Sequence, residues 1–477
     1  MTGKTMRDMT SGSPMKLILG FLIPMLFGLL FQQFYNMMDT IIVGKYLGVR
    51  ALASVGSTGS INFMIVGFCM GLCSGFAIPV AQKFGEKNET MMRRYVANSG
   101  WLTAGFSLVM TAVVCILCRQ ILRWMRTPED IIDGAYAYIF VIFLGIPATC
   151  LYNMLSGIIR SLGDSKTPLY FLLISSVMNV ALDLFTILVL HMGVAGAAWA
   201  TIISQGVSGF LCLLYIRKKF VILKMKDEEW RPDARAMRTL CSMGIPMGLQ
   251  YSITAIGSVV LQTAVNTLGS VAVASVTAGS KVSMFFCCPF DAMGATMATY
   301  GGQNVGARKL DRIHRGIKAC TMLGAVYAVA AFLVLYFFGD TIALLFVSRT
   351  ETEILANARR FLLINSAMYF PLALVNILRF MIQGLGYSRL AILAGVCEMA
   401  ARSLVGFCLV PVFGYAGACL ANPAAWVAAD LFLIPAYFQV MKRLGRLMPG
   451  ASEGESCPED ERAQGSRKRR KPLHALG

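Results

Sequence analysis

The stretch LGVRALASV at residues 47–55 returns as LGSVAVASV at residues 268–276, roughly 221 positions later in a chain of 477 residues. Other strings recur at a similar spacing: Ile23-Pro24-Met25 as Ile245-Pro246-Met247, Gly85 as Gly306, Ser161-Leu162-Gly163-x-Ser165 as Gly384-Leu385-Gly386-x-Ser388, and Ala195-Gly196-Ala197 as Ala416-Gly417-Ala418. A repeat that spans almost half of the chain predicts two copies of one folding unit.

Each copy consists of long apolar stretches. Hydrophobic residues make up 56% of the chain and charged residues only 14%, which excludes an ordinary soluble globular protein. Apolar runs long enough to cross a bilayer lie at 16–43, 51–81, 95–118, 131–159, 167–190, 194–216, 239–266, 270–300, 318–347, 354–381, 389–411 and 415–441. The sequence therefore predicts an all-α polytopic membrane protein with twelve transmembrane helices.

The repeat and the helix count together predict how the helices are arranged. Each half holds an even number of helices, so both halves enter the membrane from the same side. We therefore expect two six-helix bundles related by a pseudo-two-fold axis along the membrane normal. The expected domains are an N-terminal bundle at 1–216, a cytoplasmic linker at 217–238, a C-terminal bundle at 239–448 and a disordered cytoplasmic tail at 449–477.

Lys and Arg are distributed unevenly between the two sides of the predicted membrane. With the N-terminus in the cytoplasm, the cytoplasmic segments carry 33 basic residues and the external segments 8, which indicates a multi-pass plasma-membrane protein with both termini cytoplasmic. The net charge of +18 belongs to these segments, so nucleic-acid binding is not expected. The basic run at 467–471 favours contact with anionic membrane lipids, with nuclear targeting as the alternative.

Two carboxylates of the first half fall at the same depth in the membrane. An ionised Asp at a helix centre costs roughly 2.5–3.5 kcal/mol, so such a residue is a candidate for function. Asp39 lies roughly 10 Å and Asp183 roughly 12 Å from the external ends of their helices, and Thr201 lies at a similar depth. Asn179 precedes Asp183 by one helical turn and shares its face.

These four side chains predict a site for a small cation. Two carboxylates in a low-dielectric pocket disfavour double ionisation, and added hydroxyl and amide oxygens make a set of ligands for a hard cation. The pocket is expected to hold a proton or a sodium ion at Asp39, Asn179, Asp183 and Thr201. The alternative is that Asp39 and Asp183 each stabilise a separate contact between helices.

The second half carries a different set of charges. Glu398 and Arg402 are four residues apart in the favourable acid-first order, and Lys281 falls at a comparable depth. This cluster is expected to act as a paired-charge lock, or simply to neutralise itself and hold helices together. Asp291 and Asp430 are expected nearer the cytoplasmic ends, where snorkelling or a gate contact is favoured over ion coupling.

Signatures of enzymes are weak in this sequence. Gly206-Val207-Ser208-Gly209 matches the G-x-S-G string of intramembrane serine proteases, but the later histidines, His314 and His474, fall in a loop and in the tail. We therefore expect no enzyme activity, and no cofactor apart from a coupling ion.

Several strings resemble the multidrug and toxic compound extrusion (MATE) family. They are Pro24 followed by Tyr35-Asn36-x-x-Asp39-x-x-x-x-Gly44, Gln82-x-x-Gly85 with its echo Gly302-Gln303-Asn304-x-Gly306-Ala307, Arg160-x-x-Gly163-Asp164-x-x-x-Pro168, and Asn179-x-x-x-Asp183 followed by Gly196-Ala197-Ala198-x-Ala200-Thr201. The resemblance covers all twelve predicted helices. It implies two lobes around a central cavity and export of amphipathic, often cationic compounds, driven by inward flow of sodium ions or protons.

The resemblance is strongest to the damage-inducible (DinF-type) branch, where cation coupling occurs in the N-terminal lobe. It places the coupling site at Asp39, Asn179, Asp183 and Thr201 and the substrate cavity at Gln32, Tyr35 and Asn153. The norfloxacin-exporter branch carries an acid in its seventh helix, whereas residues 241–280 hold no Asp or Glu. A coupling site of that kind is therefore not expected.

The expected mechanism is alternating access by a monomer whose two bundles rock against each other. One alternative is a flippase of lipid-linked or polysaccharide precursors from the same superfamily, which would have extra helices and a strongly basic cavity. Two competing hypotheses from different classes are a membrane hydrolase that uses Ser208 and a passive channel.

Overall fold

The computed structural model describes residues 7–125 and 127–448, and every regular element within these ranges is helical. The first half comprises α1 (Pro14–Leu47), α2 (Val49–Ser57), α3 (Gly59–Gly85), α4 (Glu89–Trp124), α5 (Ile132–Leu144), α6 (Ile146–Ser161), α7 (Lys166–Leu184), the π-helical turn η1 (Phe185–Val189) and α8 (Val194–Lys219). The second half comprises α9 (Ala234–Asn266), α10 (Ser270–Gly306), α11 (Leu310–Ala343), α12 (Thr352–Ala367), α13 (Tyr369–Gly384), α14 (Ser388–Leu404), the π-helical turn η4 (Val405–Leu409), α15 (Val410–Phe413) and α16 (Tyr415–Leu447).

The number of spans agrees with the sequence prediction. Ten helices of the described ranges are long and apolar enough to cross a membrane, and two bent pairs raise the total to as many as twelve. The pair α5 and α6 is bent by 45°, and the pair α12 and α13 by 52°. The predicted all-α, polytopic membrane fold is thus confirmed.

The backbone repeats between the halves as the sequence does. Eight of the ten residues with positive φ in the described ranges form matched pairs: Gly48 with Gly269, Lys87 with Arg308, Gly163 with Gly386, and Gly193 with Gly414. Three of these four pairs are glycines, which adopt positive φ without steric strain. The two π-helical turns, η1 and η4, also follow equivalent helices, α7 and α14. The repeat therefore reflects a shared backbone path.

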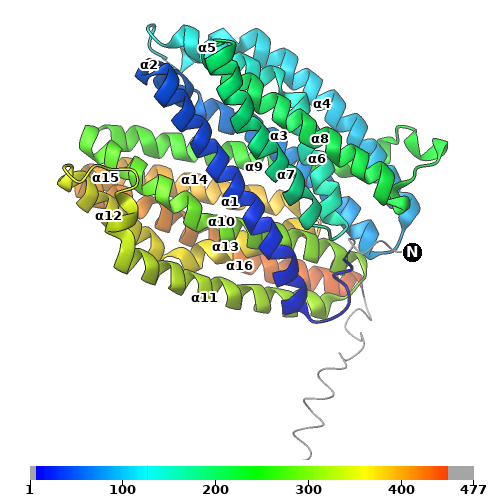
Figure 1. Ribbon diagram of the computed structural model, residues 1–477. Helices are drawn as coiled ribbons and strands as arrows, with labels where there is room; N and C mark the ends of the chain where they lie inside the picture. Colours follow the sequence, from blue (N-terminus) through cyan, green and yellow to red (C-terminus); the bar gives the residue numbers. More distant parts are fainter. Residues whose placement is uncertain (1–6, 126, 449–477) are drawn as a thin grey trace, which may run out of the picture.

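Figure 1 shows α2 to α8 gathered on one side and α10 to α16 on the other, with α1 running along both. The halves meet mainly where α3 packs against α9 and α10. Glycines allow this approach, because a Cβ on Gly75 would lie 2.5 Å from the Cα of Gly244. The boundaries of the two predicted domains stay a prediction.

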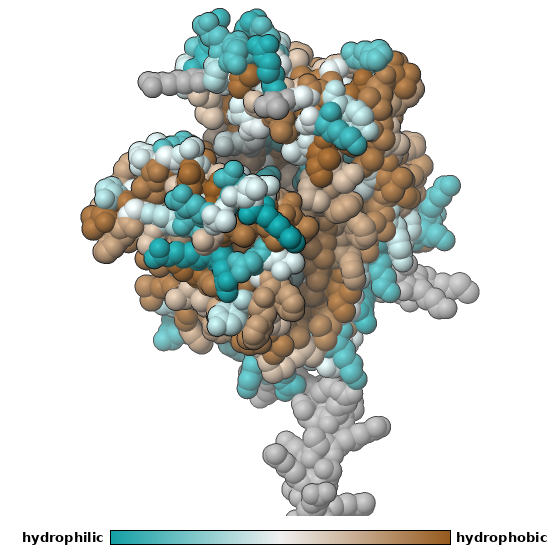
Figure 2. All heavy atoms as spheres, turned by 60° about the vertical axis from the view of Figure 1, so that its left-hand side comes forward, coloured by the Kyte–Doolittle hydropathy of each residue, from teal (hydrophilic) through white to brown (hydrophobic). Residues whose placement is uncertain are grey.

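The halves touch at the end of the molecule where α1 begins and α16 ends, which we call the termini end. There Gln82 Nε2 donates to Gly384 O at 2.9 Å, and Gln303 Nε2 donates to Ser161 O at 2.8 Å. Away from this end the two groups of helices diverge in Figure 1. Figure 2 turns the left-hand side of Figure 1 toward the viewer and shows a hollow between the two groups of helices.

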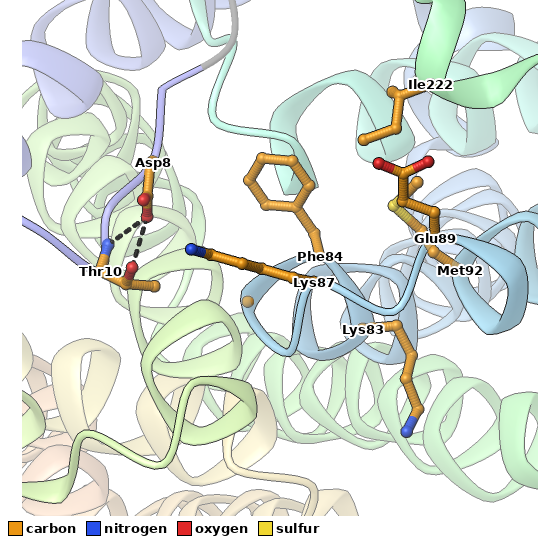
Figure 3. Close-up of a pocket in the computed structure, with 9 residues that line it drawn as sticks. Asp8, Thr10, Lys83, Phe84, Lys87, Glu89, Met92 and Ile222 are labelled. Carbon is orange, nitrogen blue, oxygen red and sulfur yellow. Dashed lines mark hydrogen bonds between the residues drawn. The ribbon is translucent and has the colours of Figure 1, made fainter.

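A short segment before α1, the N-terminal strap (residues 7–13), lies across the junction at the termini end. Met9 is fully buried, and its N–H donates to Gln303 Oε1 at 2.9 Å. Arg312 donates to Met9 O at 3.2 Å and to Gly12 O at 2.8 Å. The strap therefore ties the start of the chain to the second half. Beside it lies a cavity of about 210 Å³. Figure 3 shows Asp8 and Thr10 of the strap on one side of this cavity and Phe84, at the end of α3, on the other.

The linker between the halves is anchored to α4. Its short 3-10 turns, η2 (Val221–Leu223) and η3 (Asp227–Trp230), bring Glu229 against Arg93, whose Nε donates to both carboxylate oxygens at 3.0 and 2.9 Å. Burial favours the neutral acid, but the Lys226 N–H and Arg93 stabilise the carboxylate more and hold the pKa of Glu229 below its usual value. The linker is thus a docked element on the first half.

Candidate functional site

The residues predicted to bind a cation come from three helices of the first half. Asp183 is fully buried on α7, and Asn179, one turn earlier, is 2% exposed. Asn179 Nδ2 donates to Thr201 Oγ1 of α8 at 3.4 Å. Directly after Asp183 the helix widens into the π-helical turn η1, a local distortion that is frequent at functional sites.

Asp39 of α1 reaches the same place. Its carboxyl group lies within hydrogen-bonding reach of the carboxyl group of Asp183. Among the residues described, no donor bonds Oδ1 of Asp39 or either carboxyl oxygen of Asp183. Two ionised carboxylates are both acceptors, so this pair is satisfied only when a proton or a cation lies between them.

A small cavity lies about one helical turn from the two aspartates, because its lining residues Tyr35 and Asn179 precede Asp39 and Asp183 by four residues each. Its lining residues are all polar: Tyr35, Ser175, Ser176, Asn179, Thr201, Ser204 and Gln205. Its volume of about 10 Å³ is close to the minimum for one water molecule. Asn179 Oδ1 and Ser204 Oγ have no hydrogen-bond partner in the described structure. The oxygens present suit a proton, a water molecule or a single sodium ion.

Four lining residues were not predicted from the sequence: Ser175, Ser176, Ser204 and Gln205. A helical-spacing signal was present for two of them. Ser175 lies one turn before Asn179, and Gln205 lies one turn after Thr201. Extending the predicted polar face by one turn on each helix would have found both.

The three residues predicted for the substrate cavity lie close to this site. Tyr35 contacts both Gln205 and Gln32 through its hydroxyl group. Asn153 donates to Thr149 O at 2.8 Å, and Thr149 in turn bonds Gln205 through its hydroxyl group. Gln205 therefore connects the predicted substrate-cavity residues of α1 and α6 to the small polar cavity that Asn179 and Thr201 line.

The second half contains a buried charge cluster, as predicted, but with a different membership. Arg402 Nη1 lies 3.4 Å from Glu398, and Arg379 of α13 forms the second ion pair of the same carboxylate. Lys281 was expected here, but its side chain is exposed and forms no ion pair within the described residues. The expectation rested on depth along the helix, which does not fix the direction in which a side chain points.

Two further acids, Asp291 and Asp430, lie near these ion pairs. We call the five residues Asp291, Arg379, Glu398, Arg402 and Asp430 the second-half cluster. Asp291 of α10 and Asp430 of α16 both interact electrostatically with Arg379. Snorkelling to solvent was one expectation for Asp430, but its side chain is only 7% exposed, so it does not reach solvent. Its Oδ1 has no donor in the described structure.

Ser208, the residue of the protease-like string, has a structural contact. Its Oγ donates to Phe171 O at 3.2 Å, which joins α8 to α7. His314 is bonded to Tyr437 at 3.0 Å in the second half. Its ring is therefore engaged within the half of the molecule that does not contain Ser208.

Comparison with known proteins agrees with the fold and the repeat. The MatE family model matches residues 24–185 and 246–408, one segment in each half. The chain is 29% identical to the probable multidrug resistance protein YoeA of Bacillus subtilis over 358 residues, covering 73% of this chain and 76% of the relative. It is 23% identical to the DNA damage-inducible protein F of Escherichia coli, covering 86% of this chain and 88% of the relative.

A solved structure has the same fold. The outward-facing conformation of a multidrug resistance MATE family transporter of the MOP superfamily superposes with a TM-score of 0.87 at 20% identity. The match covers 93% of this chain and 99% of that chain. The helical architecture is therefore shared over nearly the whole length of both chains.

Proposed function

The chain belongs to the MatE family of membrane transporters, and on that ground we propose that it exports amphipathic compounds, cationic ones among them. The relatives named as multidrug resistance proteins support this proposal. The termini end then faces the cytoplasm of the cell, and the hollow of Figure 2 opens to the outside. The proposed cycle alternates between this state and one in which the termini end opens.

The driving force in this proposal is the exchange of a proton or sodium ion at Asp39 and Asp183. A cation shifts the equilibrium between two states only if it binds one of them more tightly. A carboxyl pair that is dry needs a shared proton or cation, whereas the same pair in water does not. Opening and closing the site thereby couples cation movement to rocking of the two halves.

One observation carries the proposal. The side chains of Asp39 and Asp183 come from helices far apart in the chain, yet their carboxyl groups meet, and three of their oxygens lack a donor in the described structure. Stability alone does not favour such a pair, because unsatisfied buried oxygens cost free energy. A site that must bind and release a cation requires this property.

The test uses the full chain in proteoliposomes and follows efflux of a fluorescent cation under imposed gradients. We expect Asp39→Asn and Asp183→Asn each to reduce the rate of gradient-driven efflux at least about tenfold, which corresponds to about 1.4 kcal/mol or more of activation free energy. Asp133→Asn is the matched control, since Asp133 pairs with Arg119 in an exposed position. Full efflux by both variants of the pair would contradict the assignment.

The coupling ion is tested in the same vesicles. Proton and sodium gradients are imposed one at a time, and the gradient that drives efflux identifies the ion. Both ions act on the same oxygens, so Asp183→Asn is expected to abolish whichever response is found.

A further inference from the structure

The N-terminal strap follows a path that its own sequence defines. Gly12 has a φ of 85°, and Ser13 is extended in front of Pro14, the first residue of α1, so the chain leaves the helical path at this point. Asp8 Oδ1 accepts from the N–H and from the hydroxyl group of Thr10, at 2.7 and 2.6 Å, as the dashed lines in Figure 3 show. The strap is therefore an ordered element that lies across the junction of the two halves.

On one side the strap is bound firmly to the second half. The side chain of Met9 is fully buried in a hydrophobic cluster made largely of residues from α10 to α16. Met9 O accepts from Asn304 Nδ2 and from Arg312 Nη2, both at 3.2 Å. Thr10 O accepts from Lys309 Nζ at 3.0 Å. These donors lie on α10, on α11 or in the turn between them, so the strap is part of the packed second half.

On the other side the strap touches the first half over a smaller contact. The backbone of Arg7 lies against Gly163, in the loop between α6 and α7, because a Cβ on Gly163 would lie 2.9 Å from Arg7 N and closer still to Arg7 O. Beside this contact, the cavity of about 210 Å³ separates Asp8 and Thr10 of the strap from Phe84 of α3 (Figure 3). The strap is thus packed tightly on one half and loosely on the other.

Gln303 of α10 joins the strap and the first half at one point. Its Oε1 accepts from the Met9 N–H at 2.9 Å, and its Nε2 donates to Ser161 O, at the end of α6, at 2.8 Å. The Gln303 side chain is fully buried, so losing either bond leaves a polar group without a partner. Separation of the halves at the termini end would break the bond to Ser161 and the contact between Arg7 and Gly163 together.

We propose that the N-terminal strap is a latch that stabilises the state closed at the termini end, and that it stays with the second half and leaves Gly163 when this end opens. This inference rests on the alternation of states in the proposed function and adds an element that sets their balance. A contact favours one state over another only by the free energy that it has in that state alone. The strap meets this condition at Gly163, because the contact there exists only while the halves are together.

The strength of the latch is limited by the weaker of its two attachments. The attachment to the second half combines the buried Met9 side chain with several hydrogen bonds. The attachment to the first half is a van der Waals contact at Gly163 beside a cavity, so it gives way first. A strap that has lost either attachment no longer stabilises the closed state. Substitutions at the two ends should therefore shift the equilibrium in the same direction.

The experiment measures the populations of closed and open states in the full chain, separately from transport. Spin labels at Thr90 of α4 and Asp311 of α11, exposed positions on the two halves, report the distance across the termini end in a chain whose native cysteines have been replaced. Gly163→Ala places a methyl group against the backbone of Arg7 and should raise the open population at least about fivefold, which corresponds to about 1 kcal/mol. Met9→Ala removes the side chain that anchors the strap and should shift the distances in the same direction.

Each variant has a matched control. Gly386, the equivalent of Gly163 in the second half, also has a positive φ, but a Cβ there would meet only the ends of two side chains, the nearer at 3.2 Å. Gly386→Ala therefore imposes a similar backbone strain without touching the strap. Met297→Ala removes a fully buried methionine from the same hydrophobic cluster as Met9, but from α10. Both controls should keep the distance distribution of the unmodified sequence.

Amide exchange shows which half keeps the strap. The Met9 N–H, which is bonded to Gln303, should exchange slowly in Gly163→Ala and rapidly in Met9→Ala. Rapid exchange of this amide in Gly163→Ala would show that the strap leaves the second half, and would overturn its assignment to that half.

The outcomes separate this inference from the proposed function. A shift toward longer distances in Gly163→Ala and Met9→Ala, and in neither control, supports the latch even if proteoliposomes show no gradient-driven efflux, in which case only the proposed function fails. Unchanged distances in either strap variant, or an equal shift in its control, overturns the latch whatever the efflux result. Should Gly163→Ala fail to fold, Met9→Ala and its control decide the question by the same criterion.

Discussion

Replacing Gly85 by Ala is expected to push the two halves apart at the termini end. A methyl group on Gly85 would lie 1.9 Å from Gln303 O of α10, and one on Gly306 would lie 1.9 Å from Gln82 O of α3. Both clashes involve backbone oxygens, which cannot rotate away as the end of a side chain can. The two helices must therefore separate for either substitution to be accommodated.

The magnitude follows from the size of the clash. An ordinary contact of about 3.5 Å requires a separation of roughly 1.5 Å between α3 and α10. Overpacking of this kind costs about 1–3 kcal/mol, which corresponds to a change of about five- to 150-fold in an equilibrium constant. The clash exists only while the halves touch at this end, so the population of states opened there should rise by that factor.

The assay is a distance measurement between spin labels at Thr90 and Asp311, two exposed positions at the termini end, in a chain whose native cysteines have been replaced. Gly85→Ala should broaden the distribution toward longer distances. Gly100→Ala on α4 is the matched control, because a Cβ there meets nothing within 4 Å. Identical distance distributions for the two variants would refute the reasoning.

Three further predictions concern polar contacts outside the cation site. Glu229→Gln should release the linker from α4, which is detected as faster amide exchange at 221–230. Because folding lowers the pKa of Glu229, the stabilisation that its carboxylate provides is present above the pKa of the unfolded chain. It is lost as the pH falls through the pKa of the folded state. Arg312→Gln removes two bonds to the strap and should speed exchange at residues 9–12 without changing the melting temperature by more than a few degrees. Arg379→Gln leaves Glu398 with one partner and should destabilise the protein by about 3–5 kcal/mol, measured by thermal unfolding. The double variant Arg379→Gln with Glu398→Gln removes the unpaired charge as well and should regain part of this stability.

The side chains predicted for the cation site lie together, whereas the predicted charge cluster has a different membership, and the reason is geometric. Asn179 and Asp183 share one helix face by their spacing alone, and a similar depth brought Asp39 and Thr201 to them. Lys281 was predicted by depth as well, but no second spacing fixed its direction. The Lys281 side chain is exposed, and Arg379, which lies near the end of the helix predicted at 354–381, occupies the cluster instead.

Properties that depend on neighbouring residues in the chain follow from the sequence by itself. The spanning helices, the repeat and the acids within apolar runs are of this kind, because segment length and residue type are local. The meeting of Asp39 with Asp183, and the pairing of Arg379 with Glu398, depend on which side of each helix points inward. In a membrane protein the surroundings are as apolar as the core, so hydrophobic periodicity marks that side only weakly, and packing between helices decides it.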